Sequence, residues 1–537
     1  MKKYLLSLVT FLIPILNFAQ ETSEKGLDQQ IDEAFKPISD LISSIVFFEI
    51  FEGAPFVIIL LVGSALFFSL YFGFPNFRYF LTSINIVRGK YDNIDHHESG
   101  SPELAIDGDI KGTIEDESKE GEVTHFQALA TAVSGTVGNG NIAGVALAIA
   151  LGGPGATFWM IVCGLLGMST KFVECTLGVK YRDVDESGTV YGGPMYYLSK
   201  GLDQMGFKVL GKILGVVFAI LCVGASFGGG NAFQSNQAAV QLTTMFDLQG
   251  GATGVIIGVV LAILVGVVII GGIKKIASVT EKIVPFMAGT YVLASLVIIF
   301  SNIQYVGAAF TMIFEGAFTP AAGIGGVVGV IIVGFQRAAF SNEAGAGSAA
   351  IAHSAVKTKY AASEGVVALL EPFIDTVVIC TMTALVIIFF NMDTGAFEYG
   401  NAVGSTVMLN ETGAYVGGVD LTSMAYDSVI PGFRYVLTIA IILFAFSTMI
   451  SWSYYGLQSW KYLFGRGKTA DTVYKILFLL FVVIGAAATL DAVIKFSDAM
   501  ILALVFPNMI GLLFLFPKVK KELNKYMTDI KTSKQAV

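Results

Sequence analysis

Two apolar stretches of the sequence are interrupted near their middle by glycines and short polar residues. The first, residues 131–155, reads TAVSGTVGNGNIAGVALAIALGGPG, and its interrupting residues are Ser134, Gly135, Thr136, Gly138, Asn139, Gly140, Asn141 and Gly144. The second, residues 334–355, reads GFQRAAFSNEAGAGSAAIAHSA, and its interrupting residues are Ser341, Asn342, Glu343, Gly345 and Gly347. Glycine costs a helix about 1 kcal/mol per residue relative to alanine. Each cluster therefore predicts a local unwinding of a helix.

Unwound backbone of this kind can bind a small charged solute. The N-terminal end of a half-helix carries a partial positive charge that suits a carboxylate. Freed carbonyl oxygens at a C-terminal end suit an ammonium group or a sodium ion, so both ends together fit a zwitterionic amino acid. The alternative is that the glycines only let helices pack closely. Close packing explains the glycines but not the Asn, Ser and Glu beside them, because polar groups are expensive inside a membrane.

The composition of the chain places both clusters in a membrane. Among its 537 residues 54% are apolar and only 14% are charged, against about 25% charged in a soluble domain. With 60 glycines and a mean hydropathy of +0.71, a soluble or disordered protein is excluded. The net charge of -8 gives no reason to expect a nucleic-acid partner. The cysteines suit neither a disulfide framework nor a zinc site; they are Cys163, Cys175, Cys222 and Cys380.

Eleven apolar stretches are long enough to cross a hydrocarbon core of ~30 Å as helices. They lie near 54–74, 128–151, 154–178, 212–232, 253–272, 281–300, 323–347, 364–391, 432–456, 473–491 and 495–517. We therefore expect an all-α integral membrane protein. One glycine cluster opens the second to sixth spans (128–300), and the other opens the seventh to eleventh (323–517). Five spans invert the next group, so we expect two inverted repeats behind one extra N-terminal helix, 54–74.

The distribution of basic residues predicts how the chain is oriented. Loops assigned to the inside hold 25 of the 33 lysines and arginines, whereas the outside loop 392–431 holds none. The positive-inside rule then places the N-terminus outside and the C-terminus in the cytoplasm of a plasma (inner) membrane. Residues 75–127 become an acidic cytoplasmic linker and 518–537 a basic cytoplasmic tail. His96 and His97 lie among carboxylates in this linker, but a solvated charged segment explains them better than a metal site.

The first residues are typical of a secretory signal peptide. They read MKKYLLSLVTFLIPILNFAQ, with two lysines, a short apolar run and Ala19 at the expected cleavage position. The prediction is a signal peptide over 1–19 and an extracytoplasmic segment over 20–53. An uncleaved short anchor is the alternative.

A pair of hydroxyl residues offers oxygen ligands to a small hard cation. Ser447 and Thr448 lie midway through the ninth span, in FAFSTMISWSYYG. The alternative is that both hydroxyls bond to the preceding turn of their own helix, as Ser and Thr commonly do in membranes. The residues alone leave both interpretations open.

Long ordered motifs from about residue 122 to 517 resemble the alanine or glycine:cation symporter family. They are SGTVGNGNIAGVALAIALGGPGATFW, GMSTKFVECTLGVKYRD, YGGPMYYL, FSNEAGAGSAAIAHSA, ALLEPFIDTVVICTMTALV and FSTMISWSYYG. The resemblance implies the leucine-transporter fold, two inverted five-helix repeats preceded by one helix. It also implies sodium-coupled uptake of alanine, glycine or a similarly small amino acid, with a proton gradient as the alternative driving force. Sodium is then a coupling ion, and no cofactor is expected.

The same resemblance implies roles for individual residues. Asn139, Gly140 and Asn141 are implied to face the substrate carboxylate. Near the ammonium group and side-chain pocket it places Phe340, Ser341, Asn342 and Glu343, and Gln234 resembles a further substrate contact. For sodium it implies the backbone carbonyls of Ser134 and Val137 together with the hydroxyls of Ser447 and Thr448. Asn139 stands where many members have threonine, and Gln234 has the alternative of a polar residue at a helix end.

Three carboxylates within the spans need their own interpretation. Glu174 and Asp375 are either coupling carboxylates or, as we expect, groups that pair with Lys171, Arg337 or hydroxyls to hold helices together. Glu343 either binds the substrate ammonium or only caps the unwound backbone.

Other classes of protein fit the sequence less well. No P-loop or HExxH motif is present, and GNGNIAG lacks the glycine spacing and preceding strand of a dinucleotide site. An enzyme is therefore not expected. A passive channel is the remaining alternative, but two non-equivalent interrupted helices in one chain suit alternating access better than a symmetric filter.

Overall fold

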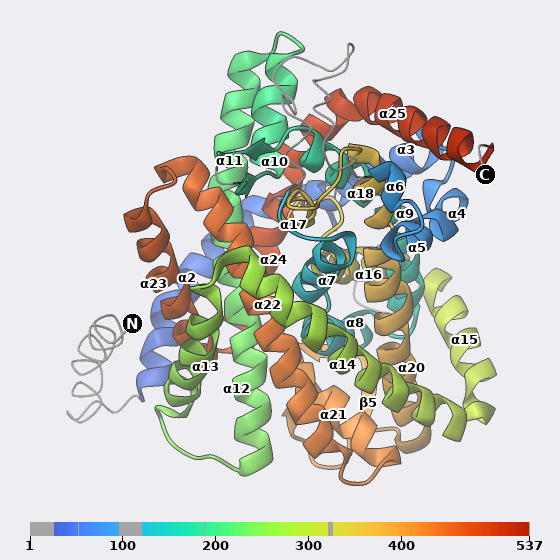
Figure 1. Cartoon of the computed structure of the whole chain (residues 1–537). Helices are drawn as coiled ribbons and strands as arrows, with labels where there is room; N and C mark the ends of the chain where they lie inside the picture. The colour runs from blue at the N-terminus through green and yellow to red at the C-terminus, as the bar shows by residue number, and fades with distance from the viewer. Residues whose placement is uncertain (1–25, 52, 96–120, 187, 320–325, 536–537) are drawn as a thin grey trace.

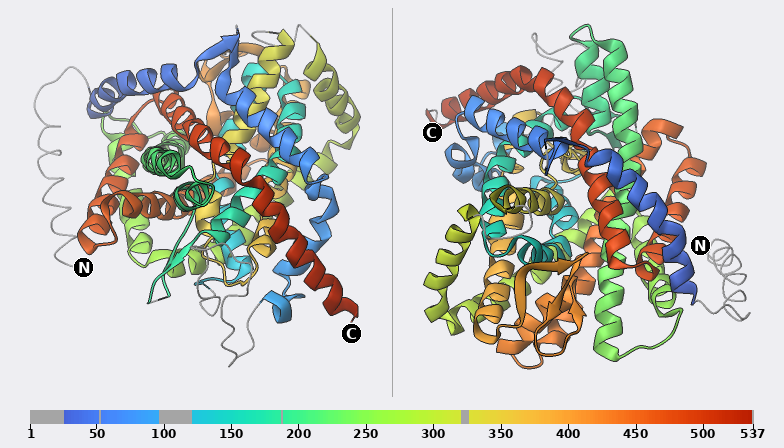
Figure 2. Two further views of the ribbon diagram at one scale, coloured as in Figure 1. Left: turned by 90° about the horizontal axis from the view of Figure 1, so that it is seen from above. Right: turned by 180° about the vertical axis from the view of Figure 1, so that it is seen from behind.

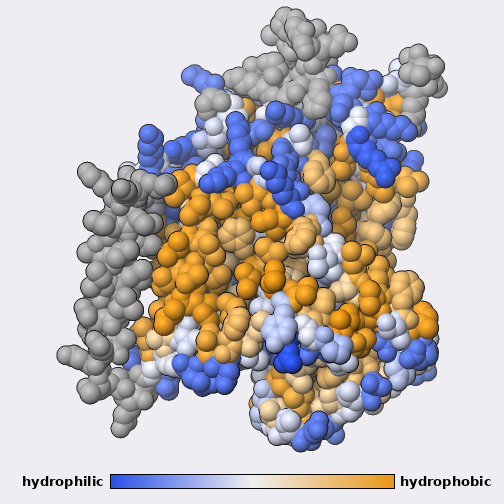
Figure 3. All heavy atoms as spheres, turned by 60° about the horizontal axis from the view of Figure 1, so that its bottom comes forward, coloured by the Kyte–Doolittle hydropathy of each residue, from blue (hydrophilic) through white to orange (hydrophobic). Residues whose placement is uncertain are grey.

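The computed structural model describes residues 26–51, 53–95, 121–186, 188–319 and 326–535. The predicted signal peptide, His96, His97 and most of the acidic linker lie outside these residues. Helices fill almost the whole described chain (Figure 1). Figure 3 shows a broad band of hydrophobic side chains across one face, with hydrophilic residues gathered above and below it. This is the surface expected of a protein that spans a membrane.

The elements follow one another in three groups. The N-terminal part contains α2 (Leu27–Val46), β1 (Glu49–Phe51), β2 (Ala54–Pro55), α3 (Phe56–Tyr71), α4 (Pro75–Arg78), α5 (Phe80–Val87) and α6 (Asp92–Asp95). The middle part contains α7 (His125–Thr136), η1 (Gly140–Gly144), α8 (Val145–Gly152), α9 (Gly155–Lys180), β3 (Asp183–Val184), β4 (Val190–Tyr191), α10 (Pro194–Tyr196), η2 (Tyr197–Gly201), α11 (Lys208–Phe227), η3 (Gly228–Ala232), α12 (Phe233–Phe246), α13 (Thr253–Ile269) and α14 (Gly272–Ser301).

The C-terminal part contains α15 (Ile303–Phe318), α16 (Gly326–Asn342), α17 (Ala349–His353), α18 (Ala361–Val367), α19 (Leu370–Pro372), η4 (Phe373–Cys380), α20 (Thr381–Thr394), β5 (Phe397–Val403), β6 (Thr406–Leu409), β7 (Tyr415–Val416), α21 (Gly418–Val429), α22 (Phe433–Phe464), α23 (Lys468–Ala487), α24 (Leu490–Ala503) and α25 (Val505–Gln535). Here η marks a π-helical segment. One of them, η1, directly follows the first predicted interruption, and η4 packs against α16, which precedes the second. Such segments often accompany functional sites.

Seven helices in the described chain are long and apolar enough to cross a membrane. An eighth span results when α7 and η1–α8, which meet at a bend of 50°, are counted together. Three shorter apolar helices, α3, α13 and α16, lie at three other predicted span positions. The interval between the predicted repeats also contains a helix that the sequence did not predict, α15.

The segment before the first predicted span is also ordered. Helix α2 packs along α24, where the Ser39 hydroxyl donates to the Ala492 carbonyl oxygen over 2.7 Å. Figure 2 shows α2 and α3 crossing the back of the molecule beside α24 and α25. The segment 20–53, which the sequence predicts to be extracytoplasmic, is thus mostly a helix in its described part, packed against the membrane bundle.

The loop 392–431, which the charge distribution predicts to lie outside, forms a small structured cap. Strands β5, β6 and β7 make an antiparallel sheet in that order, and α21 follows it. Helix α21 reaches the first interrupted helix, because the Thr422 hydroxyl donates to the Ile142 carbonyl oxygen over 3.1 Å. The cap lies at the lower end in Figure 1, whereas the last residues of α25 lie at the upper end.

Candidate substrate and ion site

The first interruption separates α7 from η1 by three residues. Helix α7 starts with a capping box between Thr124 and Gln127. The residue that follows its last turn, Val137, has a ψ of 88°, which turns its carbonyl out of the helix direction. The backbone becomes helical again in η1, where the Asn141 side-chain oxygen accepts a hydrogen bond from the Gly138 N–H over 2.9 Å. The glycine cluster thus produces the predicted unwinding, and a neighbouring amide satisfies the freed backbone.

Gln234 connects this interruption to α12. Its side-chain oxygen accepts the Asn139 N–H over 3.0 Å, and the Asn139 amide nitrogen donates to the Gln234 carbonyl oxygen over 3.4 Å. Gln234 is 3% exposed. It is therefore a buried partner of the first interruption, near the start of α12.

The second interruption lies between α16 and α17 and is a fuller unwinding. Three residues there adopt left-handed backbone: Glu343 (φ 56°), Gly345 (φ 97°) and Gly347 (φ 81°). Glycine tolerates this region, whereas a residue with a side chain holds it only when its surroundings require it. The Glu343 carboxylate accepts hydrogen bonds from the Trp452 indole N–H, over 2.8 Å, and from the Ser348 hydroxyl.

The two interruptions meet in the centre of the molecule. A Cβ placed on Gly140 would lie 3.5 Å from the Phe340 ring and 3.6 Å from the Ser341 Cα. Asp375 on η4 joins them further, because its Oδ1 accepts the Asn141 amide over 2.6 Å and the Ser341 hydroxyl over 3.2 Å. Residues 234 positions apart are thereby brought together. Asn342 donates instead to the Thr376 hydroxyl, over 2.9 Å.

The predicted sodium ligands also lie together, but the two hydroxyls behave differently. The Thr448 hydroxyl donates to the Ser134 carbonyl oxygen over 3.0 Å, so it crosses from α22 to α7. The Ser447 hydroxyl donates to the Phe444 carbonyl oxygen of its own helix over 3.1 Å. The backbone of Ser447 still takes part, since its carbonyl accepts the Ser134 hydroxyl over 2.8 Å. The Ser447 hydroxyl thus bonds to its own helix and also contacts the Met287 sulfur of α14 over 3.4 Å, whereas the Thr448 hydroxyl bonds to the α7 backbone.

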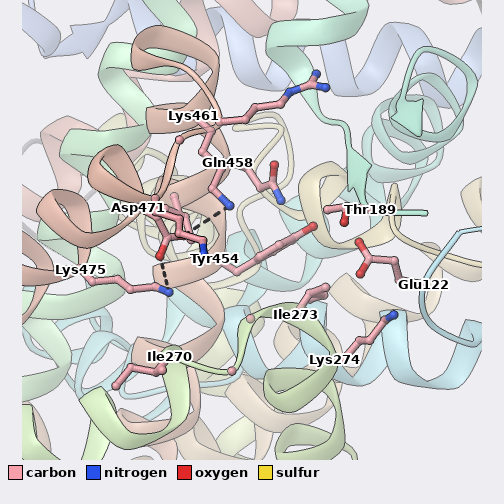
Figure 4. A pocket seen from close by; sticks show the side chains of 16 residues that line it. Glu122, Thr189, Ile270, Ile273, Lys274, Tyr454, Gln458, Lys461, Asp471 and Lys475 are labelled. Carbon is pink, nitrogen blue, oxygen red and sulfur yellow. Dashed lines mark ion pairs between the residues drawn. The ribbon is translucent and has the colours of Figure 1, made fainter. Parts of the chain in front are cut away.

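All the predicted site residues are enclosed by protein. Their exposed fractions run from 0% to 5%, with Phe340 at the upper end. A cavity of about 430 Å³ opens instead further along α22, between that helix, the corner joining α13 to α14, and the start of α23. Figure 4 shows Tyr454 reaching into this cavity, with Asp471 paired to Lys461 and Lys475. Tyr454 lies six residues from Thr448, or about 9 Å along a helix.

The carboxylates of the spans have partners other than the predicted lysine and arginine. Lys171 pairs with Glu371, at 3.0 Å, and Arg337 pairs with Asp498. Glu174 instead accepts the Gly345 N–H over 3.0 Å and the Asn508 amide over 2.7 Å. The expectation that Glu174 pairs with one of the two cations is therefore wrong. Hydroxyl pairing is correct for Asp375, which accepts from Thr376 as well as Ser341.

Two residues near the site were missed by the sequence interpretation. Trp452 fixes the Glu343 carboxylate, and the Ser451 hydroxyl donates to the Ser134 hydroxyl over 3.1 Å. Both lie within one helical turn of Thr448 in α22, so the 3.6-residue period could have indicated them. The cysteines are all free and buried, which agrees with the absence of a disulfide framework. In the described chain no group of three or more metal-binding side chains occurs.

Interrupted membrane helices that meet at a buried polar centre are typical of secondary transporters. The model of the sodium:alanine symporter family matches residues 40–537, so the chain belongs to this family of transporters and not to a family of enzymes. The Sodium/alanine symporter AgcS of Methanococcus maripaludis is 40% identical over 91% of this chain and 97% of that protein. The Amino-acid carrier protein AlsT of Bacillus subtilis is 33% identical over 84% of this chain and 85% of its own.

Among solved structures, MhsT in complex with L-phenylalanine aligns with 74% of this chain and 99% of its own. The TM-score of that alignment is 0.49 and the sequence identity is 15%.

Proposed function

We propose that the protein couples the inward movement of sodium to the uptake of a small neutral amino acid, alanine or glycine, by alternating access. The observation that carries the proposal is the meeting of the two interruptions at Gly140, Phe340 and Ser341. Family membership and the names of the relatives AgcS and AlsT support sodium and an amino acid as the solutes. The substrate carboxylate is assigned to residues 139–141, and the ammonium group and side chain to residues 340–343, with Gln234 beside them.

The sodium ion is assigned to the carbonyls of Ser134 and Val137 and to the hydroxyls of Ser447 and Thr448. Support comes from the contact of Thr448 with the Ser134 carbonyl, which brings oxygen atoms of α7 and α22 together. A small hard cation prefers such oxygen ligands. The Ser447 hydroxyl can join them while it donates to Phe444, because its oxygen keeps lone pairs for the ion.

The proposed architecture is that of eleven transmembrane helices in the leucine-transporter arrangement. The inverted repeats are 128–300 and 323–517, and the extra helix is 54–74. The order of elements supports this, since an interrupted helix opens each repeat: α7 with η1–α8, and α16 with α17. The N-terminus is assigned to the outside and the C-terminus to the cytoplasm of the plasma membrane, which makes the cavity beside Tyr454 a route toward the cytoplasm.

The driving force is sufficient for accumulation. One sodium ion entering down 100 mV gains ~2.3 kcal/mol. A tenfold sodium gradient adds about 1.4 kcal/mol, and together these sustain an accumulation of several hundredfold for a neutral solute.

The test is uptake of labelled alanine, and then glycine, into proteoliposomes. An inward sodium gradient is compared with an equal potassium gradient, each with and without an inside-negative potential. We expect accumulation that requires sodium and increases with the potential. Uptake driven by a proton gradient but not by sodium would overturn the ion assignment. Entry without counterflow of labelled substrate would indicate a passive channel and overturn the carrier.

A further inference from the structure

One buried carboxylate contacts two half-helices: α7, which precedes the first interruption, and α17, which follows the second. Glu364 on α18 contacts His125, the first residue of α7, and His353, the last residue of α17. The Glu364 Oε1 lies 2.5 Å from the His353 Nδ1, and its Oε2 contacts the His125 Nδ1. The exposed fractions of the three side chains are 5% for His125 and 0% for the other two. None of these contacts is needed to form the substrate site.

Each histidine has a second carboxylate on its other ring nitrogen. The His125 Nε2 lies 3.7 Å from Asp95 on α6, and the His353 Nε2 lies 3.5 Å from Glu371 on α19. The cluster then ends at Lys171 on α9, which pairs with Glu371 at 3.0 Å. At its other end the Tyr526 hydroxyl of α25 donates to Asp95 over 3.1 Å. From Asp95 to Lys171, three carboxylates thus alternate with three basic side chains along a continuous buried path.

The charge of this cluster depends on the two histidines. With neutral rings, three carboxylates face only Lys171, which leaves two negative charges uncompensated in a buried place. With both rings protonated, three cations balance three anions. Glu174 on α9 and Glu343 in the second interruption also interact electrostatically with Lys171, and neither brings a positive charge that could replace a histidine proton. Because burying unpaired charge is expensive, the cluster favours a proton on each histidine.

We propose that His125 and His353 form a proton-binding site that fastens α7 and α17 to Glu364 and so holds the cytoplasmic side of the transporter closed. The inference rests on the proposed alternating access. The ligand of this site is the proton, and Glu364 is the carboxylate that both histidines contact. Loss of the protons at higher pH leaves two neutral imidazoles on the carboxylate and weakens both connections. The half-helices α7 and α17 then separate more easily, which favours the inward-open form.

The protonation state can be measured directly because the chain has only four histidines. In the full-length His96→Gln/His97→Gln variant labelled with [15N]histidine, only His125 and His353 give imidazole signals. We expect both rings to be cationic at pH 8, where an ordinary histidine of pKa about 6.5 is only ~3% charged. Neutral rings at pH 8 would overturn the proposal. This measurement does not depend on transport, so its failure is distinguishable from failure of the proposed function.

The fastening of the half-helices has a separate test. Hydrogen–deuterium exchange of α7 and α17 is compared between the wild type, Glu364→Gln, and Asp498→Asn as a matched control. Asp498 is also a buried partner of a cation, but it joins α24 to α16 through Arg337. We expect exchange in α7 and α17 to accelerate at least tenfold in Glu364→Gln and to stay near wild type in Asp498→Asn. Unchanged exchange in Glu364→Gln, or equal acceleration in both variants, would contradict the proposal.

If the Glu364→Gln protein does not accumulate in cells, the two single histidine variants provide the same test. His125→Gln is expected to accelerate exchange mainly in α7, and His353→Gln mainly in α17. Acceleration of neither helix would overturn the proposed clamp.

Discussion

The two interrupted helices solve the same problem with different chemistry. At the first, three residues leave the helix, and neutral amides of Asn141 and Gln234 bind the freed backbone N–H groups. At the second, three residues adopt left-handed backbone, and carboxylates take part through Glu343 and Glu174. The first interruption therefore has no charged side chain of its own, although Asp375 contacts it, whereas the second includes Glu343 and contacts Glu174. For a zwitterion this asymmetry is appropriate: an uncharged N–H-rich segment suits the carboxylate and an acidic one suits the ammonium.

The comparison of the two interruptions is tested most strongly by adding a methyl group at Gly138 or at Gly140, both in the first interruption. A Cβ on Gly138 would lie 2.4 Å from the Thr448 hydroxyl oxygen, whereas one on Gly140 meets nothing closer than 3.5 Å. We expect Gly138→Ala to lose sodium-driven alanine uptake by more than about tenfold, or about 1.4 kcal/mol. Gly140→Ala should retain most of its uptake. Gly140→Leu, which extends into the space between the interruptions, should abolish substrate binding while the protein still reaches the membrane.

Uptake in proteoliposomes, normalised to the inserted protein, measures these variants. Equal activity of the two alanine variants would show that the crowding near Thr448 is not essential. Normal uptake by Gly140→Leu would remove the meeting point of the interruptions from the substrate site.

The acidic character of the second interruption is tested by Glu343→Gln. The amide keeps the size of the side chain but removes its charge and places an N–H₂ group against donors from Trp452 and Ser348. We expect the KM for alanine to rise about tenfold, since charged hydrogen bonds contribute about 1.5–3 kcal/mol. Glu174→Gln is the matched control, because Glu174 also contacts the second interruption, through the Gly345 N–H and the Asn508 amide, but is not among the residues assigned to the substrate. A similar KM in both variants would assign Glu343 to capping the backbone alone.

The sodium assignment distinguishes two neighbouring hydroxyls. Thr448→Ala removes the contact with the Ser134 carbonyl, whereas Ser447→Ala removes a bond within its own helix. We expect the sodium concentration for half-maximal uptake to rise about fivefold in Thr448→Ala, equivalent to about 1 kcal/mol, and less in Ser447→Ala. An unchanged sodium dependence in both variants would move the ion elsewhere.

The smallest expected effect concerns the cap over the first interruption. Burial raises the pKa of Asp420 on α21 to about 6, and a hydrogen bond from Thr244 only partly opposes this. The folded state therefore holds the proton more tightly than the unfolded chain, whose aspartate has a pKa of about 3.9. Stability should fall as pH rises from about 4 to 6 and then stay level. Thermal unfolding of Asp420→Asn should lack this component, and an identical pH dependence in wild type and variant would refute it.

The interruptions themselves were predictable because their signal is local. Glycine and short polar residues inside an apolar run weaken the helix wherever it lies, and the structure unwinds at both predicted places. The apolar runs likewise predicted membrane helices, since length and hydropathy suffice for that. Family membership followed from long ordered motifs, and the match over residues 40–537 confirms it.

Partner choice was not predictable, because it depends on segments hundreds of residues apart. The sequence marked Asp375 as a candidate but not that it would join Asn141 to Ser341. It predicted Lys171, Arg337 or hydroxyl partners for Glu174, which instead accepts hydrogen bonds from Gly345 and Asn508. It also gave no indication that one carboxylate, Glu364, would bind both histidines. A buried polar group must find a partner wherever packing places one. The sequence by itself thus determined where the helices break, and only the tertiary structure decided what binds the broken ends.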